Sequence, residues 1–178
     1  MKVNYLYLPN HPPAMKRCVS IILLCVLSGL AAPARSRFQT FDKAGFYAAM
    51  ASGQLEEINQ ELSAVAASSV KEKEAYRGAL LMRKAGLLSR AKEKLAIFKS
   101  GCIEMESSIA RDTGNIEYHF LRLMIQEHAP KVVHYDKDRE IDSRDIIRSF
   151  PGLSPVLQKA ILNYCPHSKL LHEKELNG

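Results

Sequence analysis

The strongest constraint on the fold is a run of apolar residues that recur at steps of four, three, four, three and four between positions 91 and 109. These residues are Ala91, Leu95, Phe98, Cys102, Met105 and Ile109. Such spacing keeps one side of an α-helix apolar, whereas the side chains of a strand alternate with a period of two. The chain therefore contains a long amphipathic helix, and its apolar side needs another packed element to cover it.

The remainder of the chain after residue 40 shows the same helical pattern. Leu55, Ile58, Leu62 and Val65 again recur at steps of three and four, which predicts a second helix in this part of the chain. Alternating runs of β-branched residues, which indicate strands, are absent from the sequence. We therefore expect an all-α protein, built as an antiparallel array or bundle of six to seven helices.

Turn and capping residues predict where these helices begin and end. Gly53 is expected to end a first short helix, and Ser89 is a candidate N-cap for the helix over 91–109. Asn115 is the expected cap of the next helix, which Pro130 closes. A charged helix over 136–150 follows. The Ser154–Pro155 pair then predicts the start of the last helix, which gives way to a short polar tail.

The first 34 residues differ in composition from the rest of the chain. They contain no Asp or Glu, and Lys16 and Arg17 directly precede an apolar stretch at 19–30. The small residues Ala32 and Ala34 then provide a cleavage pattern, so we expect a secretory signal over 1–34 and one helical domain over 35–178. Translation from Met1 or from Met15 is compatible with this pattern. An exported protein of the periplasm or cell envelope is the expected location.

The formal net charge is +6, but basic and acidic residues are interspersed along the chain. Nucleic-acid binding depends on a clustered basic surface with aromatic residues for stacking, and this pattern is absent. We therefore expect no nucleic-acid partner. The apolar stretch at 19–30 is shorter than the roughly 20 residues that a spanning helix needs, so membrane contact is expected only through the signal segment.

The segment NIEYHFLRLMIQEHA, residues 115–129, is apolar over more than half of its helical circumference. We expect it to be the central helix of the fold. Its narrow polar strip consists of His119, Arg122 and Gln126, with His119 interpreted as a surface residue. His119 and His128 project to opposite sides of a helix because nine residues separate them, so they cannot ligate one metal ion from this helix alone. The residues to check for function are Glu117, Tyr118 and His128.

No other pattern in the chain indicates a metal, a cofactor or a catalytic residue. The acidic residues Asp136, Asp138 and Glu140 alternate as in a calcium loop, but Ile141 and Ile147 occupy the positions that require glycine and glutamate. Phosphate-binding glycine loops and nucleophile elbows are absent from the sequence.

Two cysteines, Cys102 and Cys165, follow the predicted signal segment. They are candidates for a disulfide bond in an exported protein, although two free thiols are the favoured interpretation. Cys102 falls within the apolar spacing of the helix over 91–109, where a cysteine acts as a small apolar residue.

The segment GCIEMESSIARDTGN, residues 101–115, resembles the second helix and turn of a tetratricopeptide repeat. Gly101, Met105 and Ser108 match that pattern, and Thr113 stands at the place of its turn proline. The residues after Asn115 do not match the first helix of the next repeat. The resemblance implies close packing of a helix pair in part of the chain.

The stretches FYAAMASGQLEEIN, AYRGALLMRKAG and EYHFLRLMIQEHAP make the chain similar to small exported helical proteins of Bacteroidota. The similarity extends over residues 38–172. It implies an exported helical protein and no activity, cofactor or site residue.

Two functional hypotheses follow from the sequence. The first is a non-catalytic scaffold of the cell envelope that binds another protein or a peptide, because packed helices leave grooves suited to such contacts. The second is an envelope enzyme or small-ligand binder with a site between helices.

Overall fold

The structure, a computed structural model, describes residues 41–176 of the chain. The described residues belong to a single unit of the chain. The predicted signal segment at 1–34 lies outside the described residues.

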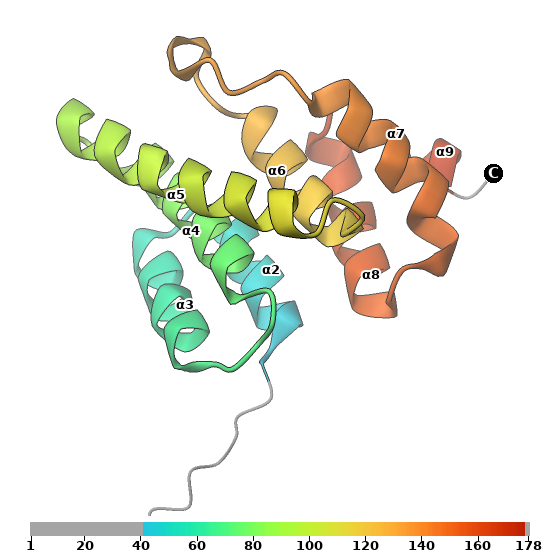
Figure 1. Ribbon diagram of the computed structural model, residues 1–178, viewed down its shortest axis with the longest axis horizontal. Helices are drawn as coiled ribbons and strands as arrows, with labels where there is room; N and C mark the ends of the chain where they lie inside the picture. Colours follow the sequence, from blue (N-terminus) through green and yellow to red (C-terminus); the bar gives the residue numbers. More distant parts are fainter. Residues whose placement is uncertain (1–40, 177–178) are drawn as a thin grey trace, which may run out of the picture. The chain divides into compact units, whose positions relative to one another are not determined.

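Residues 41–176 form α-helices and short 3₁₀ helices without a strand, so the all-α prediction is confirmed (Figure 1). The elements are α2 (Lys43–Ser52), α3 (Leu55–Ala67), α4 (Lys73–Leu87), α5 (Ala91–Arg111), α6 (Ile116–Gln126), η1 (Lys131–Val133), α7 (Arg139–Ser149), η2 (Phe150–Gly152), α8 (Pro155–Tyr164), η3 (Cys165–His167) and α9 (Glu173–Leu176). Within residues 41–176, helices α2 to α8 agree with the six to seven expected, and α9 is a single additional turn.

Three of the predicted helix ends are confirmed. Gly53 follows α2 with a φ of 68°, a left-handed conformation that glycine adopts without steric cost. The Asn115 side chain accepts a hydrogen bond from the backbone N–H of Glu117 at the start of α6. The Ser154 hydroxyl likewise accepts from Leu157 N, and Pro155 is the first residue of α8.

Three other boundaries were predicted wrongly. Ser89 does not cap α5, because Arg90 holds the N-cap position and makes no side-chain capping bond. Helix α6 ends at Gln126, four residues before Pro130, because the backbone first enters a turn in which Ala129 N donates to Ile125 O. Helix α7 begins at Arg139 rather than at residue 136.

Helices α4 and α5 form a close antiparallel pair. Glu74 near the start of α4 pairs with Arg111 at the end of α5, and Gly78 faces Gly101 further along the pair. A Cβ atom on Gly101 would lie 2.6 Å from the carbonyl oxygen of Gly78, so the two backbones touch where both residues lack side chains. This close pairing involves the residues that resemble a tetratricopeptide repeat. The repeat itself stays a prediction.

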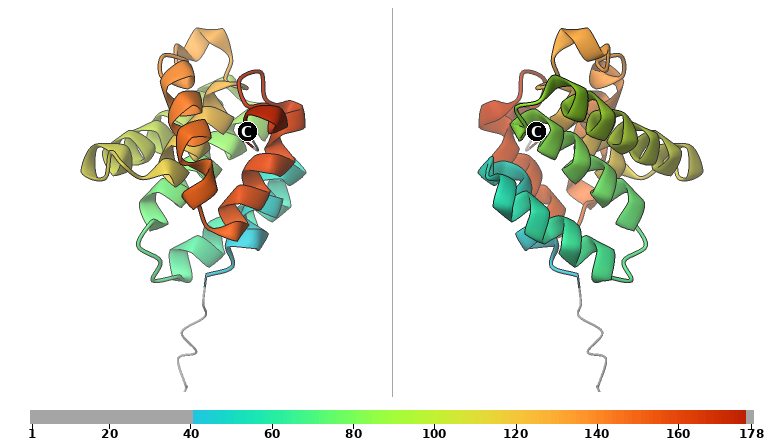
Figure 2. Two further views of the ribbon diagram at one scale, coloured as in Figure 1. Left: turned by 90° about the vertical axis from the view of Figure 1, so that its right-hand side faces the viewer. Right: turned by 90° about the vertical axis from the view of Figure 1, so that its left-hand side faces the viewer.

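Successive helices from α2 to α5 pack against one another, and α6 contacts α4, α5 and α7. Helix α8 returns to contact α2, so the last long helix lies beside the first described one (Figure 2). Helix α6 therefore has neighbours on several sides, as expected for the central helix. Its residues Phe120, Leu121 and Leu123 are completely buried.

The segment after α8 is not only a polar tail. Leu171 and Leu176 are buried in the same core as the main helices. The Glu127 carboxylate fixes this segment, because it accepts hydrogen bonds from Ser168 Oγ at 2.8 Å and from Lys169 N at 2.7 Å.

None of the helices between residues 41 and 176 combines the length and the apolar character that crossing a bilayer demands.

Candidate functional site

Glu117, the first of the predicted candidates, is a buried hydrogen-bond acceptor. Its carboxylate accepts from the hydroxyls of Tyr47 at 2.9 Å and Tyr76 at 2.8 Å, and from Lys43 Nζ at 2.7 Å. Burial first, and then the Glu117 charge, raise the pKa of both tyrosines above the usual value, so both hydroxyls remain protonated. All three partners lie within the fold. Glu117 therefore fixes α6 to α2 and α4.

Tyr118, the second candidate, is buried and borders a polar recess of about 680 Å³. The other residues of this recess are Lys71, Lys73, Glu74, Ser108, Arg111 and Asp112. Burial raises the pKa of the Tyr118 hydroxyl, with smaller contributions from the nearby acidic side chains. The charges of the recess are mixed, and Arg111 already pairs with Glu74.

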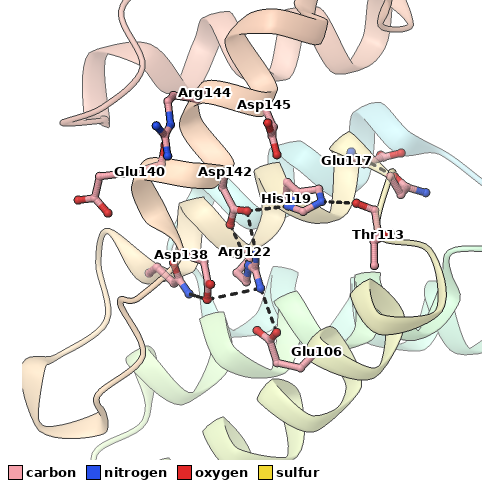
Figure 3. Close-up of polar contacts among 12 residues, drawn as sticks. Glu106, Thr113, Glu117, His119, Arg122, Asp138, Glu140, Asp142, Arg144 and Asp145 are labelled. Atoms are coloured by element: carbon pink, nitrogen blue, oxygen red, sulfur yellow. Dashed lines mark hydrogen bonds and ion pairs between the residues drawn. The ribbon is translucent and has the colours of Figure 1, made fainter.

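The polar strip of α6 is buried, and the prediction that His119 lies at the surface is wrong. His119, Arg122 and Gln126 are each at most 7% exposed. The cause is Asp142 on α7, which is completely buried and accepts hydrogen bonds from both His119 and Arg122 (Figure 3). The cationic side chains of His119 and Arg122 and the Asp142 carboxylate thus form a paired cluster between α6 and α7.

Arg122 is the centre of this cluster. Its Nε and Nη2 each lie 2.8 Å from an oxygen of Asp142, and its Nη1 lies 3.0 Å from Glu106 Oε2 and 3.5 Å from Asp138 Oδ2. Tyr135 also donates to Glu106, at 2.5 Å. Glu106, whose side chain is 42% exposed, is thus an acceptor for both Arg122 and Tyr135. A bidentate arginine–carboxylate pair of this geometry is strong and directional.

His119 cannot act as a general base in this arrangement. Its Nδ1 lies 2.6 Å from Asp142 and its Nε2 lies 2.9 Å from the carbonyl oxygen of Thr113. Both partners are acceptors, so both ring nitrogens carry hydrogen and the imidazole is a cation. The hydrogen bond to Asp142 raises the pKa of His119 against the opposing effect of burial. The cluster therefore joins two helices and leaves no nitrogen free to accept a proton.

Within residues 41–176, no group of three or more histidine, cysteine, aspartate or glutamate side chains is arranged to hold a metal ion. Asp138, from the sequence that hints at a calcium loop, lies beside Arg122 instead. Cys102 and Cys165 are both free thiols. The Cys102 sulfur lies 3.4 Å from the Met82 sulfur, in the contact between α4 and α5.

His128, the third candidate, borders a groove between α2, α4, α5, α6 and α8. The groove has a volume of about 1330 Å³ and is partly open to solvent. Buried apolar and aromatic residues form its deeper part, among them Tyr47, Met50, Met82, Phe98, Ile125 and Tyr164. Small residues line much of the remainder, including Ala44, Ala48, Ala51, Ala85, Gly86 and Ala160.

Three large apolar residues in the groove are exposed. Leu95 is 45% exposed, Val132 is 80% exposed and Val156 is 40% exposed. Leu95 belongs to the apolar spacing that predicted the long helix, and its expected place in the core is wrong. The N-terminal end of α5 faces the groove rather than another helix, so its apolar side remains uncovered there. Uncovered apolar surface that gathers in one hollow is typical of a binding site.

The charged residues that line the groove are all basic. They are Arg83 on α4, Lys94 on α5 and Lys159 on α8. Arg83 Nε donates to the carbonyl oxygen of Met50 at 2.9 Å, which holds the guanidinium at the wall between α4 and α2. The groove thus combines an apolar lining with positive charge.

Two carboxylates of the α6 segment hold tyrosines in this groove. Tyr47 donates to Glu117 at 2.9 Å, and Tyr164 donates to Glu127 at 2.8 Å. The single hydroxyl hydrogen of Tyr164 goes to Glu127, so His128 Nε2, 3.2 Å from the same oxygen, must carry the hydrogen of that contact. Burial lowers the pKa of His128, which keeps its ring neutral near pH 7.

The three predicted residues therefore do not converge on one site. Glu117 lies beneath the groove, Tyr118 borders a separate recess, and only His128 lines the groove. The basic residues Arg83, Lys94 and Lys159 were missed by sequence reasoning. They belong to three different helices, and each looks like an ordinary solvated residue on its own helix.

Comparison with protein-family models, with curated proteins and with solved structures finds no match to this chain. The functional argument therefore depends on the geometry of the groove.

Proposed function

We propose that this chain is an exported helical protein of the cell envelope that binds a helical segment of another protein in its apolar groove. The observation that carries the proposal is the gathering of Leu95, Val132 and Val156, all exposed and apolar, in one hollow lined by further apolar residues. Amphipathic helices bind to such grooves by inserting their apolar side chains and leaving their polar side in water.

The dimensions of the groove support a helical occupant. Pockets for small molecules commonly have volumes of about 300–1,000 Å³ and enclose most of the ligand. This groove is larger, at about 1330 Å³, and is partly open to solvent. A helix is about 10 Å across with 1.5 Å of rise per residue, so the volume corresponds to roughly eleven residues, or three turns. The small residues Ala44, Ala48 and Ala51 on α2 let a helix backbone approach closely.

The alternative is a small-molecule ligand between the helices. His128 favours it, because a neutral imidazole at the edge of an apolar hollow is suited to a specific polar contact. An envelope enzyme has less support, since His119 is blocked at both nitrogens and Glu117 is occupied by three donors.

Site-specific photo-crosslinking of the full chain in intact cells tests the proposal. A photoreactive amino acid replaces Val132 in the groove, and the matched control replaces Ile141, which is 51% exposed but does not line the groove. We expect one identified protein to crosslink from position 132 and not from position 141. Mass spectrometry should locate the crosslink in a helical segment of that protein.

The variant Ala48→Trp places a bulky side chain on an exposed residue of the groove wall and should abolish the crosslink. Equal crosslinking from both positions would contradict the proposal. A thermal shift of the full chain by a small metabolite, without a protein crosslink, would favour the alternative instead.

A further inference from the structure

The basic residues that line the groove are not engaged in salt bridges within the described part of the chain. Among the described residues 41–176, Arg83, Lys94 and Lys159 form no ion pair with an acidic side chain. Elsewhere Arg77 pairs with Glu104, and Arg122 pairs with Asp142. The groove is therefore lined by three basic side chains that have no salt-bridge partner among the described residues.

This positive charge is distributed around the apolar lining. Arg83, Lys94 and Lys159 come from three different helices, and no aspartate or glutamate lines the groove. Near pH 7 the neutral His128 adds no charge of either sign. A partner that places acidic side chains beside an apolar surface would gain favourable electrostatic contacts with all three residues, whereas a basic partner would meet repulsion.

We infer that the groove binds an acidic amphipathic helix of about three turns, with apolar side chains toward the lining and carboxylates toward Arg83, Lys94 and Lys159. This inference rests on the proposed function and adds the charge of the partner. Tyr47 and Tyr164 are each held by a carboxylate, and the Arg83 guanidinium is held by the carbonyl oxygen of Met50. The lining of the groove is therefore in place before a partner binds.

Two synthetic peptides of equal length test the inference with the full chain. Both carry the same apolar residues at steps of three and four, and the flanking positions are all Glu in one peptide and all Lys in the other. Fluorescence anisotropy at low salt measures their affinities. Each exposed ion pair raises the affinity about two- to threefold, so three such pairs should make the acidic peptide bind at least about tenfold more tightly than the basic one. The difference should shrink as salt is added.

Charge reversal in the protein provides the matched variants. Lys94→Glu and Lys159→Glu should each weaken binding of the acidic peptide and strengthen binding of the basic one. Lys99→Glu is the control, because Lys99 is an exposed residue on the same helix as Lys94 and does not line the groove. It should leave the ratio of the two affinities unchanged.

The outcomes separate this inference from the proposed function. If both peptides bind with equal affinity and the Val132→Arg variant binds neither, the inference about the partner's charge is overturned. The proposed helix-binding groove would remain. Binding of neither peptide, together with binding of oleate or of vesicles containing phosphatidylglycerol, would overturn both. Val132 is 80% exposed, so its substitution tests the groove without disturbing the core.

Discussion

The Nδ1 atom of His119 lies 2.6 Å from Oδ1 of Asp142, and this contact joins α6 to α7 inside the fold. Asp142 is completely buried and is shared with Arg122. Burying an isolated carboxylate costs free energy. Here two cations, His119 and Arg122, donate hydrogen bonds to the Asp142 carboxylate. The cluster is therefore a structural connection whose strength depends on the protonation of His119.

The stability of the protein should depend on pH through His119. The pKa of His119 is raised in the folded state, mainly by the hydrogen bond to Asp142, above its value of about 6.5 in an unfolded chain. The resulting stabilisation is complete below about pH 6.5 and is lost as the pH rises through the folded pKa. Urea unfolding between about pH 6 and about pH 9 should show a larger loss of unfolding free energy for the wild type than for His119→Gln.

His172→Gln is the control for this experiment, because His172 is exposed. It should retain the pH dependence of the wild type. The lowered pKa of His128 acts in the opposite direction, at lower pH, and is common to all three proteins. Parallel curves for the wild type and His119→Gln would show that the contact with Asp142 does not stabilise the charged imidazole.

Glu117→Gln should destabilise the fold by about 1–3 kcal/mol, because a buried acceptor of three hydrogen bonds loses its charge. Thermal or urea unfolding followed by circular dichroism measures the change. Glu57→Gln, at an exposed position of α3, should change the stability by less than about 0.5 kcal/mol. Equal effects of the two substitutions would show that the tyrosine contacts of Glu117 contribute little.

Gly101→Ala should also be destabilising, since its new Cβ would lie 2.6 Å from the Gly78 carbonyl oxygen and 3.0 Å from Met82 N. Backbone atoms cannot move aside as a flexible side chain does, so α4 and α5 must separate. We expect a loss of about 1–3 kcal/mol of unfolding free energy. Gly86→Ala is the matched helical control: nothing lies within 4 Å of its Cβ, and alanine should be neutral or stabilising there.

The two thiols should react slowly with iodoacetamide in the folded protein. Burial raises the pKa of Cys102 to about 12 and also raises the pKa of Cys165. Only the thiolate is nucleophilic, so alkylation of Cys102 near pH 8 should be at least about a hundredfold slower than in the urea-unfolded chain. Peptide mass mapping measures each site separately. Recovery of a disulfide-linked pair of peptides containing Cys102 and Cys165 would contradict the free thiols seen in the structure.

Much of the secondary structure was predictable because its signals are local. The apolar steps from Ala91 to Ile109 require only that neighbouring turns share one side of a helix. Asn115 and Ser154 likewise satisfy N–H groups within a few residues of themselves. The candidate residues of the segment 115–129 were chosen from the same local view, and only His128 among them lines the groove.

The surroundings of a residue on its helix were less predictable. The polar strip of α6 was expected in water, yet it is buried because Asp142 arrives from another helix twenty residues beyond Arg122. Leu95 fits the apolar spacing of α5 as well as Met105 does, but the first is 45% exposed and the second is completely buried.

Helix positions and most helix ends in this chain thus follow from periodicity and capping, which act over a few residues. The burial of charged side chains depends on which helices become neighbours, and so does the formation of the groove. Arg83, Lys94 and Lys159 approach one hollow because α8, which packs beside α2, borders the same groove as the antiparallel pair of α4 and α5. That arrangement follows from the packing of many side chains at once, and no single segment of the sequence encodes it.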